Sequence, residues 1–238
     1  MATKQIEWCG YIWDCCMENG RIIHPKQPWM WYDEDMVSVD ENGVLTLNAC
    51  VKPKQVKYWD GRVFNPTHAV GTIRSTTTFG YGRYSCEIQL PDGNNCWPAF
   101  WLTGANSWPP EIDVMEAFQT NSSYFVLTIP QPPYLVPSWW VTNNTHYLGD
   151  DGMKKAYGSR GIPICKLLIN PKKNFVKYEC VWNPDIIVFH VNGKKIRTIK
   201  NPKNIEPSMK VIFDCWGSET KFSVTQPMKC KNFKYEPL

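Results

Sequence analysis

Three carboxylates stand within six positions of an otherwise apolar segment, EIDVMEAF. In a β-strand, successive side chains point to opposite faces, so Glu111 and Asp113 share one face. Glu116 follows Asp113 by an odd step and would face away, unless an extra residue at Val114 or Met115 forms a β-bulge. Carboxyl groups held close together raise the pKa of at least one member and leave another ionised. The spacing predicts an acid and a nucleophile, and the alternative is a solvated strand edge with outward charges.

The segments that must position these residues read as β-strands. GRYSCEIQLP alternates, with Tyr84, Cys86, Ile88 and Leu90 expected to point to one side. CWPAFWLT is a short apolar run, which we interpret as a strand with a bulge or an edge at Pro98. A Pro-rich turn, GANSWPP, then leads the chain to the carboxylate segment.

Two turn dipeptides predict hairpins. Asn42-Gly43 separates VSV from LTL, and Asn192-Gly193 joins DIIVFHV to KKIRTI. Residues 130–163 are rich in Pro, Gly and Trp, and we expect an irregular insertion there. No stretch has a sustained helical period, so short strands with frequent turns favour an all-β sandwich of two sheets.

The composition, 43% hydrophobic and 20% charged, is typical of a folded globular chain, and we expect a single domain over residues 1–238. No run is long enough for a signal peptide or a transmembrane helix, so a membrane role is not expected. The localisation stays open. We expect action outside the cell, by a secreted, lysis-released or phage-borne protein.

The ten cysteines include no CxxC pair, which argues against a zinc site. Four lie in apolar or alternating stretches, where a free cysteine behaves as a small buried hydrophobe: Cys86, Cys165, Cys180 and Cys215. The alternative is a disulfide, with Cys9, Cys15 and Cys16 as the cluster that invites it.

Charge is distributed unevenly along the chain. Residues 1–152 hold 9 Lys and Arg against 16 Asp and Glu, whereas residues 153–238 hold 17 against 6. Scattered solvated lysines account for this pattern, and binding of anionic glycans is a secondary hypothesis. Nucleic acid is not an expected partner, because no nucleic-acid motif accompanies the lysines.

The segment EIDVME resembles the ExDxxE signature of glycoside hydrolase family 16 in its bulged form, as in the laminarinase, agarase and carrageenase group. Its flanks agree in order: FGYGRYSCEIQLP, then WPAFWL, then Trp108-Pro109. Downstream, YECVWNPDIIVFHVNG is similar to a strand pair of that family. The resemblance implies a concanavalin-like β-jelly-roll, in which two curved antiparallel sheets form an open cleft for polysaccharide.

By motif position, the resemblance implies that Glu111 is the nucleophile and Glu116 the acid/base, with Asp113 between them holding Glu111 in place. A retaining mechanism on a β-linked polysaccharide follows, with the two catalytic carboxyls about 5–5.5 Å apart. No cofactor is required, although a structural calcium stays open, and we expect a monomer. The alternatives are a transglycosylase and a lectin-like carbohydrate-binding protein on the same fold.

Five tryptophans are candidates for stacking on sugar rings: Trp97, Trp101, Trp108, Trp139 and Trp140. For Trp97, Trp101 and Trp108 the alternative is a place in the core. For Trp139 and Trp140 it is a hydrophobic contact that holds the long loop against the protein. His146 resembles the histidine that many family members place near the cleft, and a purely structural role is the alternative for it.

Overall fold

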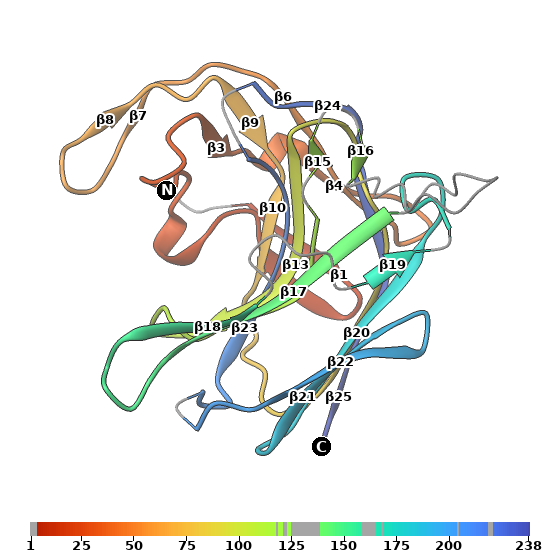
Figure 1. Ribbon diagram of the computed structural model, residues 1–238. Coiled ribbons are helices and arrows are strands. Elements are labelled where there is room, and N and C mark those ends of the chain that lie inside the picture. The colour runs from red at the N-terminus through yellow and green to blue at the C-terminus, as the bar shows by residue number, and fades with distance from the viewer. Residues whose placement is uncertain are drawn as a thin grey trace.

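Two antiparallel sheets form the body of the protein in the computed structural model (Figure 1). The structure describes residues 4–117, 119–120, 123–124, 139–158, 165–167, 169–203, 205–218 and 221–238. The predicted all-β sandwich is confirmed. Helix in the described residues is confined to two 3-10 turns, η1 (Glu18–Gly20) and η2 (Glu34–Met36), and no described helix is long and apolar enough to cross a bilayer.

The carboxylate segment lies in the larger sheet, which has nine strands among the described residues. Its order is β1 (Gln5–Trp8), β2 (Tyr11–Asp14), β10 (Thr72–Ser75), β23 (Met209–Gly217), β13 (Cys96–Gly104), β14 (Glu111–Glu116), β17 (Trp139–Leu148) and β18 (Lys154–Gly158), and β19 (Cys165–Leu167) also pairs with β17. The strands β23, β13 and β14 are therefore central.

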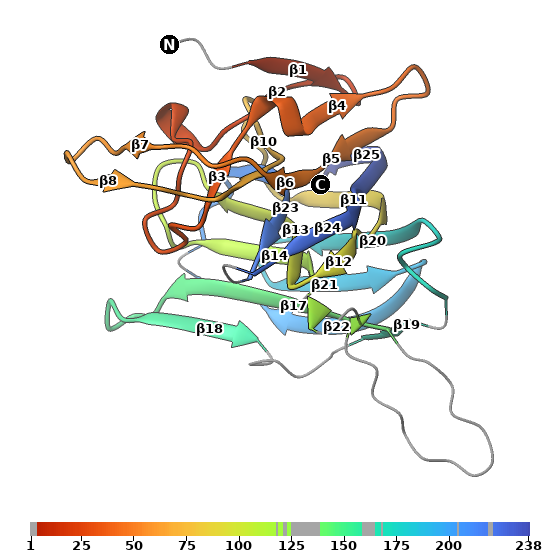
Figure 2. The same ribbon diagram turned by 90° about the horizontal axis from the view of Figure 1, so that it is seen from above.

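The second sheet has seven strands in the described part of the chain. Its order is β22 (Lys194–Lys200), β21 (Ile186–Val191), β20 (Val176–Trp182), β11 (Gly82–Gln89), β25 (Met228–Pro237), β5 (Leu45–Leu47) and β4 (Val37–Val39). Figure 2 shows the two sheets side by side, with β18 and β22 near one end and β1 and β4 near the other.

Smaller pairings complete the fold. They are β3 (Met30–Tyr32) with β9 (His68–Val70) and β6 (Ala49–Val51), β7 (Val56–Lys57) with β8 (Val63–Phe64), β12 (Asp92–Asn94) with β24 (Ser223–Gln226), and β15 (Gln119–Thr120) with β16 (Ser123–Tyr124). The β7–β8 hairpin projects away from the two sheets in Figure 1.

Alternation along the strands builds the core between the sheets. On β11, Tyr84, Cys86 and Ile88 are fully buried, as predicted. On β23, Phe213 points into this core and stacks on Phe100 of β13 at a centroid distance of 4.5 Å. Burying each such aromatic side chain contributes roughly 1.5–3 kcal/mol. The intervening residues of β23 point to the opposite face of the sheet, where the functional cleft lies.

Both predicted hairpins form. β4 pairs with β5 across the turn at Gly43, and β21 pairs with β22 across Asn192-Gly193. Asn192 and Gly193 have φ values of 47° and 76°, which is the left-handed geometry that a two-residue hairpin turn requires.

The expectation of a bulge or an edge at Pro98 is wrong. β13 lies between β23 and β14, and its register with β23 is regular from Cys96 to Gly104. The Pro98 carbonyl accepts a hydrogen bond from the Ala117 backbone N–H, just beyond the end of β14. Proline has no N–H to donate, and the Pro98 nitrogen faces the same side as its carbonyl, beyond the end of β14. No hydrogen bond between β13 and β23 is therefore lost.

The prediction of an irregular insertion at 130–163 is also wrong for residues 139–158, because these residues form the β17–β18 hairpin. The pattern escaped detection because β17 buries polar residues: Asn143 and Thr145 are 1% and 0% exposed. Hydrophobic alternation is therefore absent. The rest of that segment lies outside the described residues.

The nine cysteines whose side chains the structure describes form no disulfide, so the disulfide alternative for Cys9, Cys15 and Cys16 is wrong. Cys86, Cys180 and Cys215 are buried, as predicted, and the side chain of Cys165 lies outside the described part of the structure. Burial raises the pKa of the Cys15 thiol to about 12, which keeps it protonated.

Candidate active site

A β-bulge at Val114 brings the three carboxylates onto one face of the nine-stranded sheet. β14 pairs regularly with β13 up to Asp113, and the register shifts before Met115, so Val114 is the extra residue. Val114 and Met115 both belong to the core, while Glu116 returns to the face that carries Glu111 and Asp113. The bulge predicted from the odd spacing is confirmed.

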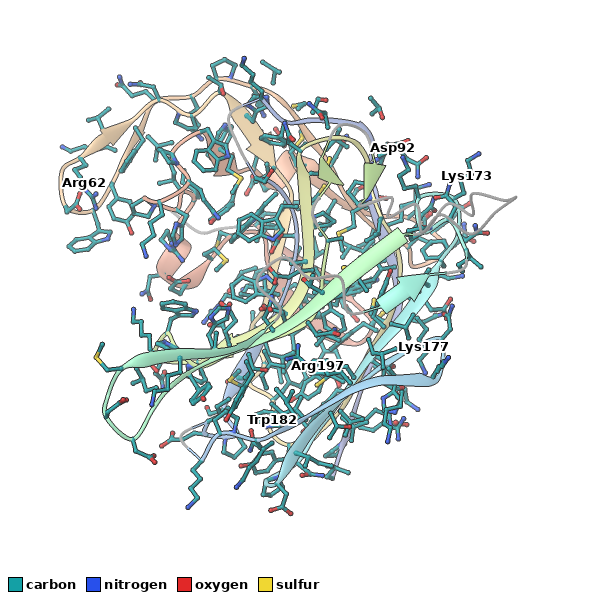
Figure 3. All side chains as sticks on the ribbon, in the orientation of Figure 1. Arg62, Asp92, Lys173, Lys177, Trp182 and Arg197 are labelled. Atoms are coloured by element: carbon teal, nitrogen blue, oxygen red, sulfur yellow. The ribbon has the colours of Figure 1, made fainter. Side chains whose placement is uncertain are left out.

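Asn143 of β17 holds the bulge from the core side. Its Nδ2 donates a hydrogen bond of 2.5 Å to the Val114 carbonyl, which the bulge leaves without a ladder partner. The Asn143 carbonyl in turn accepts a bond of 2.6 Å from Nη1 of Arg197 on β22. Figure 3 shows Arg197 between β17 and β22. Residues from both sheets therefore fix the position of Glu116.

Glu111 is bordered by two hydrogen-bond donors. Trp108 Nε1 donates to Glu111 Oε2 at 2.8 Å, and His146 Nε2 lies 3.3 Å from Oε1. His146 Nε2 is also 3.8 Å from Asp113 Oδ2. Burial lowers the pKa of His146, so the imidazole is neutral and can donate from Nε2 without charge.

Glu116 is held by two other donors. Trp97 Nε1 donates to Glu116 Oε1 at 3.0 Å, and Asn144 Nδ2 donates to Oε2. A hydrogen bond between the Asp113 and Glu116 carboxyls lowers the pKa of Glu116 and raises that of Asp113. Asp113 therefore links the environments of both glutamates.

Burial dominates the ionisation of this cluster. Desolvation raises the pKa of Glu111 to about 7, with the Trp108 hydrogen bond opposing this and the Glu116 charge adding to it. The pKa of Asp113 is raised well above its ordinary value, first by burial and then by its two acidic neighbours. The pKa of Glu116 is raised too, again mainly by burial. The cluster therefore retains protons at neutral pH.

A fourth carboxyl, Asp214 of β23, lies in the same cleft and was not predicted. It is 0% exposed, and its Oδ2 accepts a hydrogen bond of 2.7 Å from Trp101 Nε1. Burial raises its pKa well above the ordinary value, and the charges of Glu116 and Glu111 raise it further. Burial therefore favours the protonated, uncharged form of Asp214 beside the glutamates.

The cleft has a volume of about 790 Å³ and opens on the face of the sheet opposite the core. Trp97 and Trp101 share this face, as alternation predicts, and both line the cleft. Trp101 is only 8% exposed and forms the floor, whereas Trp108 is 47% exposed at the rim. Lys154 Nζ lies 4.4 Å from the Trp108 ring centroid, which orients the indole.

The other sequence candidates have different outcomes. Trp139 and Trp140 begin β17, but their side chains lie outside the described part of the structure, so their role stays a prediction. His146 lies beside the carboxylates, as expected. Sequence reasoning missed Trp216, which lines the cleft from β23 and stacks on Tyr32 at 5.7 Å.

Glu111, Asp113 and His146 are the one group of potential metal ligands found in the described residues, with ligand atoms within 4.8 Å of one another. Calcium takes about six to eight oxygen ligands, and two carboxylates with an imidazole do not match that demand. The group fits proton exchange better than calcium binding. A structural calcium elsewhere stays a prediction.

Comparison with known proteins identifies the class to which this fold and site belong. The model of glycosyl hydrolases family 16 matches residues 24–231, and the chain belongs to that family. Among solved structures, porphyranase B from Zobellia galactanivorans superposes with a TM-score of 0.68 at 16% identity, covering 98% of this chain and 88% of that one. This likeness concerns the fold.

Two curated relatives are similar in sequence. The endo-1,3-1,4-beta-glycanase ExsH of Rhizobium meliloti (strain 1021) is 24% identical over 214 residues, which is 84% of this chain and 41% of that protein. A probable xyloglucan endotransglucosylase/hydrolase of Arabidopsis thaliana, protein 11, is 26% identical over 158 residues, covering 65% of this chain and 48% of that protein. The chain spans less than half the length of both.

Proposed function

We propose that this chain is a retaining endo-glycosidase that cleaves a β-linked polysaccharide. The observation that carries the proposal is the bulge at Val114, which gathers Glu111, Asp113 and Glu116 at the floor of an open cleft. A binding protein gains little from three buried carboxyls, because their desolvation costs free energy. Membership in the family and the endo-glycanase relative support the same activity.

In the proposed mechanism, Glu116 donates its proton to the glycosidic oxygen as the bond from that oxygen to C1 breaks. Glu111 forms the new bond to C1 in its carboxylate form, which is populated as the pH approaches and exceeds its pKa of about 7, and this gives a covalent glycosyl-enzyme. Glu116, now ionised, removes a proton from water, and the water oxygen displaces Glu111 at C1. With a sugar hydroxyl in place of water, the same steps give transglycosylation, the reaction named for the Arabidopsis relative.

The surrounding side chains have matching roles in this proposal. Trp108 and His146 donate toward Glu111 and so stabilise its charge when it leaves as a carboxylate. Asp113 forms a hydrogen bond with Glu116 and lies beside His146. It can therefore exchange a proton with Glu116 as Glu116 loses and regains its own proton during the cycle. Trp97 holds the other side of Glu116.

The test is a panel of laminarin, mixed-linkage glucan, agarose, porphyran and carrageenan, with products sized after incubation. We expect short oligosaccharides from at least one polymer, and none from Glu111→Ser. Glu87→Ser is the matched control, because Glu87 lies on β11 in the other sheet and pairs with Lys231 at 3.5 Å. Binding without cleavage by the wild-type protein would favour the lectin-like alternative, and lengthened chains would favour the transglycosylase.

A further inference from the structure

Two basic side chains extend the floor of the cleft beyond the carboxylates. Arg74 of β10 pairs with Ile212 of β23, which pairs in turn with Trp101, the partner of Asp113. Residues directly opposite in antiparallel strands share a face, so Arg74 lies in one row with Asp113. Arg74 also lines the cleft.

Lys210 occupies the neighbouring row. It pairs with Thr103, which is the partner of Glu111. With strands about 4.7–4.9 Å apart, Lys210 is roughly 10 Å from Glu111 and Arg74 roughly 14 Å from Asp113, measured across the sheet. A sugar chain crossing the strands from the carboxylates therefore passes over both cations.

The guanidinium of Arg74 is incompletely paired. Among the described residues, Arg74 has no ion pair within 4 Å, and its buried Nε has no hydrogen-bond acceptor. Asp14, which lies directly opposite Arg74 on β2, and Glu18 raise its pKa through their charges, but burial, which lowers that pKa, is the larger effect. The buried Nε of this half-buried guanidinium therefore still has an N–H donor from which an anion from outside can accept a hydrogen bond.

Lys210 adds to this imbalance. It donates to a neutral acceptor, the Thr76 carbonyl, and both burial and the nearby Arg74 guanidinium lower its pKa. Arg21 also lines this end of the cleft, although its charge is paired with Glu18 at 2.7 Å. The Asp14 charge acts on both cations, but one carboxylate does not balance two positive charges, so an anion from outside would reduce their repulsion.

We propose that Arg74 and Lys210 form a subsite for an anionic substituent of the polysaccharide, a sulfate ester or a uronate carboxylate. The inference rests on the proposed function, because it names the class of glycan that occupies the same cleft. A planar guanidinium beside an ammonium can hold either oxyanion through charge-assisted hydrogen bonds.

The experiment measures binding without cleavage, in the Glu111→Ser protein, by isothermal titration calorimetry. The probes are oligosaccharides of κ-carrageenan and of its chemically desulfated form, of β-1,4-polymannuronate, and of laminarin. We expect the sulfated or the uronate probe to bind at least tenfold more tightly than the neutral ones. The probe that binds more tightly identifies the substituent as sulfate or carboxylate. Added salt should weaken the affinity for that probe more than the affinity for the neutral probes.

Variants assign the effect to the two cations. In the same background, Arg74→Gln or Lys210→Gln should weaken binding of the anionic probe by roughly tenfold or more. Arg74→Lys should keep part of it, and the control Lys57→Gln, an exposed residue of β7, should change nothing. Thermal unfolding of each variant verifies that it is folded.

Equal affinity for anionic and neutral probes, or equal losses on both when Arg74 is changed, would overturn the subsite. Failure of the wild-type protein to cleave any polymer would instead count against the proposed function, since the binding measurement does not depend on cleavage. The two failures are therefore distinguishable.

Discussion

Replacing Glu111 with Gln should make the protein more stable at alkaline pH. The pKa of Glu111 is raised from 4.5 to about 7 by burial, so the folded state binds this proton more tightly than the unfolded chain does. The stability that this proton contributes is complete below pH 4.5 and is lost as the pH rises through about 7. Glu111→Gln keeps the size of the side chain and removes the charge.

The magnitude follows from the pKa difference of about 2.5, the step from 4.5 to about 7. At about 1.4 kcal/mol for each pKa unit, the free energy of unfolding should rise by up to about 3 kcal/mol at pH 8–9. For a domain of this size that corresponds to a Tm increase of roughly 6–12 °C. Below pH 4.5 the gain should vanish, because Glu111 is then protonated in both states.

The assay is thermal and urea unfolding of wild type, Glu111→Gln and the control Glu87→Gln between pH 4 and pH 9. Glu87 has a side chain 34% exposed and an ion pair with Lys231, so its substitution should give no gain that grows with pH. A gain for Glu111→Gln that is equal at pH 4 and pH 8, or absent at pH 8, would refute the claim that burial holds the proton on this carboxyl.

Two other substitutions test the supports of the cluster. Trp97→Phe removes the donor to Glu116 Oε1, and since a hydrogen bond stabilises a charged acceptor more than a neutral one, the pKa of Glu116 should rise. One limb of the kcat/KM profile against pH should move accordingly, and an unmoved profile would contradict this. Asn143→Ala removes the donor to the bulge carbonyl and should lower the free energy of unfolding by about 1–3 kcal/mol in urea, together with kcat. Full activity and stability in that variant would show that the bulge forms without the hydrogen bond from Asn143.

The features that could be predicted from the sequence are those with a local cause. The odd step from Asp113 to Glu116 requires a bulge if the carboxylates act together, and that bulge is present. The Asn192-Gly193 turn fixes its own hairpin through two left-handed residues. The alternation on β11 reports burial of one face directly.

The features that could not be predicted depend on which strands become neighbours. Asp214 and Arg74 reach the cleft because β23 lies beside β13 and β10 lies beside β23, an order that no local pattern encodes. Asp214 also lies in an apolar run, and no neighbouring charged or polar residue marks it as part of a site. Burial favours its uncharged form. β17 escaped detection because its buried Asn143 replaces the hydrophobic residue that alternation would show.

The stereochemistry of the newly formed reducing end tests the central claim most directly. Proton NMR spectra recorded in the first minutes of cleavage, before mutarotation, separate the two anomers of the product. A retaining mechanism through Glu111 predicts that the β anomer appears first and the α anomer follows only by mutarotation. Initial formation of the α anomer would contradict the glycosyl-enzyme and, with it, the roles proposed for Glu111 and Glu116.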